Sequence, residues 1–438
     1  MFLLLMSTLF AGIALSQSPK PTAAQWQWHQ QEFYLFMHFG PNTFTGKEWG
    51  HGDEKEEIFN PGQLDTDQWC RIAQAAGAKG IIITAKHHDG FCLWPSAYSK
   101  HTVRESQWKN GKGDVLLDLS KSCQKFGLKF GVYISPWDRN HPAYGTDAYN
   151  DVYVNTMQEI FSKYGPIWEL WWDGANGEGP NGKKQVYDFP RFEKLIRSIS
   201  PGTVIFSDIG PDLRWVGNES GFAGETNWNL LDTAGFKRGE GGPPTDTLNR
   251  GNAFGKHWIP AECDVSIRPG WFYHQEEDDK VKTPAQLFDL YLKSVGRGAN
   301  LLLNVPPDTR GLIHPKDSAA LMGFRELRSQ WDDSKAIMGK CWLQTGQEPA
   351  QELVSLQDGH IETAVPLKNQ SDIVVLQLQK PAEINAVVLQ EDLREGQHCA
   401  GFVLSLYDAD GRKVKEVKGS TIGRKRILTF PTTLVQRI

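Results

Sequence analysis

Short apolar runs recur along residues 33–305, and each of them ends in polar side chains. The runs and the residues that close them are FYLFMHFG at His38, GIIITAKHHDGF at Lys86 to Asp89, LKFGVYISPWD at Asp138, IWELWWDG at Asp173, TVIFSD at Asp208, HWIPAECD at Glu262 and Asp264, and ANLLLNV at Asn304. Helical patterns such as TDQWCRIAQAAGA and VLLDLSKSCQKFG lie between many of these runs. Short apolar strands that alternate with amphipathic helices are typical of a parallel sheet.

This many repeats favours an α/β fold of the closed (β/α)8, TIM-like barrel type over an open sheet. We assign residues 21–338 to the barrel. In such barrels the active site lies at the C-terminal ends of the strands. The His, Asp and Glu side chains that end the apolar runs are therefore expected to converge at one end of the barrel.

The pattern changes after the predicted helix KDSAALMGFRELRSQWDD. Alternating or short apolar runs follow, namely IVVLQLQ, INAVVLQE, FVLSLYDADGRKVKEV and RILTF, with a turn at Asp408 to Gly411. This pattern predicts a C-terminal antiparallel β-sandwich domain over residues 339–438. Because the chain ends on TTLVQRI, which reads as the middle of a strand, we expect this domain to be truncated.

Composition narrows the class of protein. Of the 438 residues, 39% are hydrophobic and 23% are charged, as in ordinary globular proteins, and the formal net charge of −5 argues against a nucleic-acid partner. Sixteen tryptophans suit either an aromatic core or stacking on sugar faces. The six cysteines show no CxxC pair and no metal-ligand spacing, so we expect mostly buried free thiols.

The N-terminus MFLLLMSTLFAGIALSQS predicts a signal peptide over residues 1–18. It is apolar, and Ala14-Leu15-Ser16 supplies small residues for cleavage, although the usual basic start is missing. We expect export to the periplasm or beyond, with no stable membrane insertion after cleavage. An uncleaved membrane anchor and a misassigned start codon are the alternatives.

Two stretches place reactive side chains at predicted strand ends. In IWELWWDGANG the apolar run is interrupted only by Glu169 and stops at Asp173, where a carboxylate could attack an anomeric carbon, activate water or simply cap an Asp-Gly turn. His87 and His88 are adjacent, so on a strand they face opposite sides and two ligands to one metal are disfavoured. Neutral histidines could hold sugar hydroxyls, or the pair could be structural.

Several motifs resemble those of the α-L-fucosidases of glycoside hydrolase family 29. They are FMHFGPNTFTGKEWG, AKHHDGFCLWPS, GVYISPWD, ELWWDGANG and GANLLLNVPP, and the similarity extends from Trp26 to Trp331. The stretches RWVGNE and NVPPD resemble the branch of that family that prefers α-1,3/4-linked fucose. The resemblance also implies a β-domain after the barrel.

The resemblance assigns roles residue by residue. It implies that Asp173 is the catalytic nucleophile and that Tyr133 and Trp171 adjoin it. The residues that it implies for sugar binding are His38, His87 and His88 for the hydroxyls, Glu48 and Trp49 as a pair, and Trp271 against the side of the sugar that carries the C5 methyl group. No metal ion and no cofactor are implied.

The general acid/base has three candidates in loops or strand ends, Glu219, Glu225 and Glu262. Resemblance to the α-1,3/4 branch favours Glu219, although a loop glutamate is also a common solvated surface residue. Asn218-Glu219-Ser220 is a glycosylation sequon, and a glycan there would block the site, so a non-glycosylating bacterial host fits better. Arg214 could steady a substrate hydroxyl or the anionic pair, or lie on the surface.

We therefore expect an exported, retaining, exo-acting α-L-fucosidase that releases terminal α-1,3/1,4-linked fucose from oligosaccharides or glycoconjugates. One alternative is a barrel glycosidase for another sugar such as galactose, whose C5 hydroxymethyl group would need a polar partner instead of an apolar wall. The other is a carbohydrate-binding homologue without catalysis, which would be expected to lack Asp173. The C-terminal domain is treated as structural.

Overall fold

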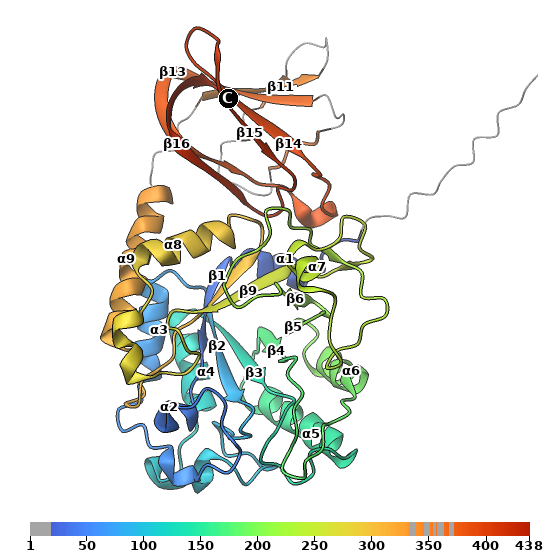
Figure 1. Ribbon diagram of the computed structural model, residues 1–438, viewed down its shortest axis with the longest axis vertical. Coiled ribbons are helices and arrows are strands. Elements are labelled where there is room, and N and C mark those ends of the chain that lie inside the picture. The colour runs from blue at the N-terminus through green and yellow to red at the C-terminus, as the bar shows by residue number, and fades with distance from the viewer. Residues whose placement is uncertain (1–18, 333–338, 346–350, 354–355, 357–362, 368–371) are drawn as a thin grey trace, which may run out of the picture.

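Eight parallel strands close into a barrel, with neighbours in the order β1-β10-β9-β6-β5-β4-β3-β2 (Figure 1). The computed structural model describes residues 19–332, 339–345, 351–353, 356, 363–367 and 372–438. The barrel strands are β1 (Phe33–Met37), β2 (Gly80–Lys86), β3 (Lys129–Ile134), β4 (Glu169–Trp171), β5 (Val204–Ser207), β6 (Leu213–Trp215), β9 (Ala261–Ser266) and β10 (Asn300–Asn304). The predicted TIM-like barrel is confirmed. The signal peptide predicted at residues 1–18 lies outside the described residues, and export stays a prediction.

Helices cover the outside of the barrel, which is why most barrel strands are buried on both faces and read as continuous apolar runs. The longer helices are α3 (Thr66–Ala75), α4 (Val115–Phe126), α5 (Ala148–Lys163), α6 (Phe189–Ile199), α8 (Pro284–Lys293) and α9 (Pro315–Asp332). Aspartates cap the starts of α3 and α4, where Asp65 accepts from Gln68 N at 3.0 Å and Asp114 from Leu117 N at 2.9 Å. Helix α4 ends at Gly127, whose φ of 68° suits glycine.

The shorter elements lie in the connections. They are α2 (Asn42–Thr45), α7 (Thr245–Arg250), the antiparallel pair β7 (Leu230–Leu231) and β8 (His257–Trp258), and the 3-10 turns η1 (Glu56–Ile58), η2 (Val103–Glu105), η3 (Trp108–Gly111), η4 (Gln275–Lys280) and η6 (Leu393–Glu395).

One barrel strand departs from the regular alternation. Residues 208–212 join β5 directly to β6 with no helix between them, and β6 is only three residues long. A strand this short has no readable alternation, so the sequence pattern did not predict it. After β6, residues 216–256 make a long excursion that contains β7 and α7 before the chain returns to the barrel through β8 and β9.

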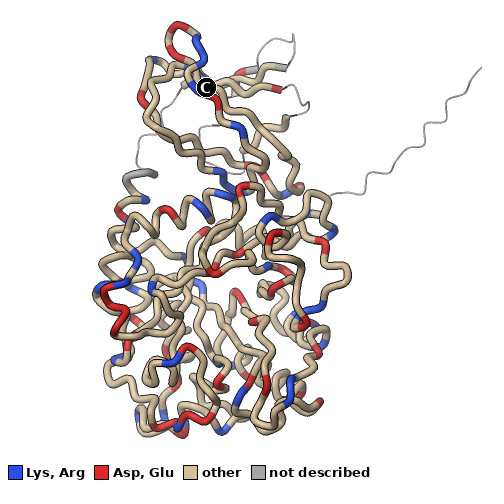
Figure 2. Tube along the Cα trace, viewed as in Figure 1, with Lys and Arg blue, Asp and Glu red and all other residues tan. Residues whose placement is uncertain are grey.

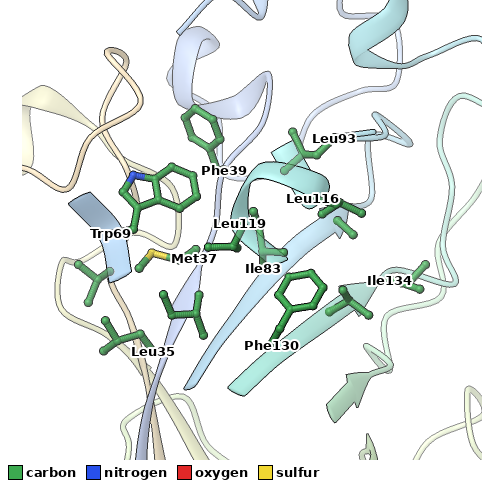
Figure 3. Close-up of a cluster of buried hydrophobic side chains, with 14 of the residues drawn as sticks. Leu35, Met37, Phe39, Trp69, Ile83, Leu93, Leu116, Leu119, Phe130 and Ile134 are labelled. Atoms are coloured by element: carbon green, nitrogen blue, oxygen red, sulfur yellow. The ribbon is translucent and has the colours of Figure 1, made fainter. Parts of the chain in front are cut away.

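The main apolar core lies between the barrel strands and the outer helices (Figure 3). Leu35, Ile83 and Phe130 point outward from three adjacent strands, and they meet Leu119 of α4 and Trp69 of α3. Burying one such side chain contributes roughly 1.5–3 kcal/mol. This core holds the barrel strands against the outer helices. Polar groups can therefore lie at the C-terminal ends of the strands without disrupting it.

Helix α1 (Ala23–His29) closes the N-terminal end of the barrel. Its Trp28 is fully buried in the barrel interior, where its indole N–H donates to Glu169 at 3.1 Å. Gln25 donates to the backbone oxygens of Asp212 and Trp258 at 2.9 and 2.8 Å, which ties the helix to the barrel. Helix α1 therefore fills the N-terminal end of the barrel, which leaves the C-terminal end for a site.

The C-terminal part is antiparallel, as predicted. Its described strands form a six-stranded sheet in the order β12-β11-β13-β16-β14-β15, in which the long strands β13 and β16 pair along most of their length. The strands are β11 (Gly339–Thr345), β12 (Gln351–Glu352), β13 (Asp372–Leu389), β14 (Phe402–Tyr407), β15 (Lys413–Gly419) and β16 (Arg426–Arg437). A separate apolar cluster that includes Leu378, Leu406 and Val435 stabilises it.

This sheet packs on the barrel end opposite to the arrowheads of β2 and β3 (Figure 1). Lys425 forms an ion pair at 2.7 Å with Glu32, which immediately precedes β1. The backbones of Arg426 and Arg297 pair in an isolated antiparallel β-bridge, and Arg297 precedes β10. Both contacts lie at the N-terminal ends of barrel strands. The sheet therefore does not cover the end where the polar residues converge.

Charges of both signs are interspersed along the chain in the view of Figure 2. Five of the six cysteines are buried, Cys399 is partly buried, and all are free, which confirms the predicted thiols. Within the described parts of the chain, none of the helices combines the length and the apolar character needed to cross a membrane.

We predict that acid destabilises the fold through His29. This side chain is fully buried, and burial, aided by the charge of Arg424, lowers its pKa to about 3. The unfolded chain protonates His29 near pH 6.5, so the unfolded state binds more protons as the pH falls from 6.5 towards 3. The free energy of unfolding should therefore drop by up to about 1.4 kcal/mol per pH unit in that range.

Urea unfolding of the wild type and His29→Phe between pH 7 and 4 measures this slope. The variant should show a shallower dependence on pH, whatever its stability at pH 7. Equal slopes for the two proteins would mean that His29 is already protonated in the fold or that it does not contribute.

Candidate active site

A cavity of about 180 Å³ opens at the C-terminal end of the barrel. Its lining residues come from many separate elements and are Phe36, His38, Glu48, Trp49, His87, His88, Tyr133, Trp171, Asp173, Ala175, Glu219, Asp264 and Trp271. This set includes every site residue expected from the sequence except Arg214. A larger hollow, of about 400 Å³, lies near the start of α8, but neither histidine nor tryptophan lines it.

Asp173 follows β4 directly, and its side chain is 27% exposed to the cavity. The Tyr133 hydroxyl donates to Asp173 Oδ2 at 2.9 Å, and Ala175 N donates to Oδ1 at 2.7 Å. His88 Nε2 lies 3.7 Å from Oδ2. Next along the chain, a Cβ at Gly174 would stand 2.0 Å from an Asp208 oxygen, so glycine allows the Asp208 side chain to lie close to this turn. The carboxylate is thus held in one orientation at the strand end.

The three cavity histidines are neutral. Burial lowers the pKa of His38 to about 3 and that of His88 to about 4, and burial lowers the pKa of His87 well below its usual value. Two of them are oriented by partners behind them, because Nδ1 of His38 lies 2.9 Å from Asn304 Oδ1 and Nδ1 of His88 lies 2.7 Å from Ser135 Oγ. Neutral imidazoles held in this way can donate or accept hydrogen bonds toward a ligand.

Aromatic rings form the floor and one wall of the cavity. Trp171 stacks on Phe206, with ring centroids 3.9 Å apart, and also on Tyr133 at 5.5 Å. The wall includes Trp271, which lies 5.0 Å from the His38 ring. At the rim Trp49 is 55% exposed, an unusual degree for so large an apolar side chain.

Glu48 lines the cavity edge, but protein groups already engage both of its oxygens. Oε2 accepts from Trp271 N at 2.7 Å, and Oε1 accepts from Phe272 N at 3.3 Å and lies 2.5 Å from His274 Nε2. Glu48 therefore holds the segment that presents Trp271, in addition to facing the cavity.

The structure separates the three acid/base candidates. Glu219 lines the cavity together with Asp173, and the indole N–H of Trp271 donates to it at 3.3 Å. Glu225 points away, with a side chain that is 80% exposed and 3.7 Å from Arg297. Glu262 is fully buried inside the barrel.

The carboxyl group of Glu262 already accepts hydrogen bonds from protein side chains. It accepts from the Trp171 indole at 2.7 Å and from the Tyr34 hydroxyl. Of the three glutamate candidates, Glu219 is therefore the one that lines the cavity together with Asp173.

The expectation for Arg214 is wrong on both alternatives. Its guanidinium contacts no cavity group and is not at the surface, since the side chain is fully buried. It donates to backbone oxygens of Leu248 at 2.8 Å, Trp228 at 3.0 Å and Ile259, and to Asn227 Oδ1 at 3.0 Å. Because protein acceptors surround the guanidinium, Arg214 has no donor directed at a substrate.

Asp264 is a cavity residue to which the sequence reasoning assigned no role. It is buried in β9, and its Oδ1 has no hydrogen-bond partner among the described residues. Burial, reinforced by the nearby charge of Glu219, raises the pKa of Asp264 well above its usual value. The sequence signal that could have identified Asp264 was its place at the end of the apolar run HWIPAECD. Asp264 adds a further carboxyl group to the cavity lining beside Asp173 and Glu219.

The described side chains include no cluster of three or more His, Cys, Asp or Glu residues arranged to hold a metal ion. The ionisable and hydroxyl groups that line the cavity are carboxyl groups, neutral imidazoles and one tyrosine hydroxyl. Carboxylates opposite each other in a small aromatic pocket are typical of glycoside hydrolysis.

Comparison with known proteins agrees with this arrangement. The family model described as alpha-L-fucosidase matches residues 13–326. Alpha-L-fucosidase 1 of Arabidopsis thaliana is 41% identical over 433 residues, which cover 96% of this chain and 83% of that protein.

Solved structures give the same result. A glycoside hydrolase 29 family member from a rumen bacterium is 39% identical, with a TM-score of 0.82 over 96% of this chain and 74% of that chain. A Ruminococcus gnavus GH29 fucosidase in complex with fucose is 29% identical, with a TM-score of 0.83 over 96% of this chain and 92% of that one. The chain therefore belongs to the alpha-L-fucosidase family, glycoside hydrolase family 29.

Proposed function

We propose that this α-L-fucosidase is a retaining, exo-acting enzyme that releases α-1,3/1,4-linked fucose, with Asp173 as nucleophile and Glu219 as general acid/base. The observation that carries the proposal is that these two carboxyl groups, from different elements, line one small cavity. A retaining mechanism requires such a pair, one member to attack and the other to transfer a proton.

In the first step a carboxylate oxygen of Asp173 forms a bond to C1 of fucose while the bond from C1 to the leaving oxygen breaks. Glu219 donates its proton to that oxygen, so the aglycone leaves as a neutral alcohol. The Tyr133 hydroxyl, 2.9 Å from Asp173 Oδ2, keeps the nucleophile aimed at C1. In the second step Glu219 takes a proton from water, the water oxygen attacks C1, and the bond to Asp173 breaks. Two inversions restore the original configuration.

The cavity offers groups that match fucose. Three neutral histidines provide hydrogen bonds for the ring hydroxyls without the cost of a buried charge. Phe36 and Trp271 supply an apolar wall for the C5 methyl group, where galactose would require a polar partner. The fucose complex of the Ruminococcus gnavus relative supports the same sugar.

The preference for α-1,3/1,4 linkages is supported by the cavity rim. The cavity of about 180 Å³ suits a single terminal sugar, which supports exo action. Outside it, the exposed Trp49 offers a stacking face to sugars next to the fucose. Branched glycans carry such neighbouring sugars close to the scissile bond.

Our first prediction for this proposal concerns the nucleophile. Asp173→Ala should lower kcat by at least about 10³-fold, because the variant lacks the carboxylate that forms the glycosyl-enzyme. The control is Asp289→Asn, which changes a half-exposed aspartate of α8 that does not line the cavity and should keep activity within about tenfold of wild type. Proton NMR of the first-formed sugar should show α-fucose with the wild type. Normal turnover by Asp173→Ala, or β-fucose as the first product, would refute the assignment.

The acid/base prediction uses leaving groups of different quality. Glu219→Ala should lose far more kcat/KM on an oligosaccharide than on 4-nitrophenyl fucoside, because nitrophenolate leaves without a proton. Azide needs no general base, so it should restore turnover of the nitrophenyl substrate and yield a fucosyl azide. Glu225→Ala is the control and should resemble wild type. If azide rescues Glu225→Ala or Glu262→Ala instead, the role belongs to that residue.

Linkage preference is tested by direct competition. With equal concentrations of a Lewis trisaccharide and 2'-fucosyllactose, fucose should be released faster from the trisaccharide. Trp49→Ala should reduce this preference mainly through KM, because it removes a stacking face and no reacting group. Faster release from 2'-fucosyllactose by the wild type would contradict the proposed specificity.

A further inference from the structure

The chain that follows Glu219 is bonded to the C-terminal sheet domain. We call residues 223–229 the anchored segment. Asn227 N donates to Thr421 Oγ1 at 2.9 Å, and Asn229 N donates to Gln397 Oε1 at 2.8 Å. Gln397 Nε2 donates back to Asn227 O at 3.1 Å. These four side chains are all nearly fully buried, so their polar groups depend on one another and not on water.

Further bonds extend the same contact. Arg426 Nη1 donates to Glu225 O at 2.7 Å, and the hydroxyls of Thr226 and Ser420 lie 2.7 Å apart. The C-terminal domain thus contacts three successive residues of the anchored segment, Glu225, Thr226 and Asn227.

The barrel holds the same segment from its other side. Arg214 donates to Asn227 Oδ1 and to Trp228 O, each at 3.0 Å. Arg297 donates to Ala223 O at 2.7 Å, and Arg297 O accepts from Asn227 Nδ2 at 3.0 Å. The segment is therefore clamped between the two domains, and this contact also accounts for the buried position of Arg214.

Only three residues separate Glu219 from the anchored segment. Within this short connection Asn218 Nδ2 donates to Phe222 O at 3.0 Å, which closes a turn around Glu219. Gly221 has a φ of 79°, and a Cβ there would lie 2.6 Å from Val265 of β9, so the turn is pressed against the barrel. A displacement of the anchored segment should also displace Glu219, because the three residues that connect them are held in a turn.

We propose that the C-terminal sheet domain positions the general acid/base, with Thr421 and Gln397 as positioning residues that act on Glu219 through the anchored segment. This inference rests on the proposed role of Glu219. Neither residue lines the cavity, so neither is placed to touch the substrate. Proton transfer is sensitive to position, and misplacement by about 1 Å can cost about 10²-fold in rate.

The test compares substrates that differ in their need for an acid. Thr421→Val is nearly isosteric and removes the acceptor for Asn227 N. Gln397→Leu removes all three hydrogen bonds of this side chain to the segment, two from Asn229 and one to Asn227 O. In each variant kcat/KM on a Lewis trisaccharide should fall by about tenfold or more, because its leaving group needs the acid. On 4-nitrophenyl fucoside, whose leaving group does not, kcat/KM should fall by less than about threefold. Thr421→Ser keeps a hydroxyl acceptor and should retain the wild-type ratio of the two substrates.

Thr433→Val is the matched control in the same domain, because its hydroxyl donates only within its own strand, to Pro431 at 2.7 Å. It should behave as wild type on both substrates. Urea unfolding shows that each variant is folded under the assay conditions. Equal losses on both substrates, or no loss on either, would overturn the positioning role.

Glu219→Ala, measured in the same assay, separates this inference from the proposed function. If Glu219→Ala shows no dependence on the leaving group, the acid/base assignment fails and the inference fails with it. If Glu219→Ala shows the dependence while Thr421→Val and Gln397→Leu do not, the acid/base assignment stands and the positioning role alone is wrong.

Discussion

Closure of the parallel barrel is the constraint on which the rest of the structure depends. Eight parallel strands that close on themselves bring their C-terminal ends to one rim, so side chains far apart in sequence face a common cavity. Asp173 reaches the cavity from just beyond the end of β4, and Asp264 reaches it from the second half of β9. Helix α1 plugs the opposite end with Trp28, and the C-terminal sheet packs there as well, which leaves one end for chemistry.

Burial then sets the chemical state of each group at that rim. Taken out of water, the three cavity histidines are neutral, and the pKa of Asp264 is raised well above its usual value. The cavity therefore combines hydrogen-bonding groups that carry no charge with the carboxyl groups of Asp173 and Glu219. Such a set suits a neutral sugar whose anomeric carbon becomes positive in the transition state, since negative charge is then concentrated where it stabilises that carbon.

Much of the fold and part of the site could be predicted from the sequence. Apolar runs that end in polar residues indicated the barrel and placed Asp173, His87 and His88, because periodicity and strand ends are local features. Glu219 required the family resemblance, since a loop residue has no pattern of its own. Arg214 was misjudged because it lies within the three-residue strand β6, which is too short to show which side of the barrel its side chains face.

Contacts between distant segments could not be predicted at all. The position of Asn227 between Arg214 and Thr421 depends on packing between two domains, and no local pattern encodes it. The antiparallel nature of the last hundred residues was evident from alternation. How the long strands β13 and β16 pair within one six-stranded sheet was not, because strand order depends on nonlocal pairing.

Trapping the covalent intermediate tests the central claim, that Asp173 forms a bond to fucose, most directly. A 2-deoxy-2-fluoro-fucosyl fluoride has a good leaving group, while its fluorine at C2 slows hydrolysis of the glycosyl-enzyme, so the intermediate accumulates. Mass spectrometry of the protein and its peptides should find one fluorofucosyl group per chain, attached to Asp173. A label on Glu219, Asp208 or Asp264, or turnover without any covalent adduct, would contradict the account.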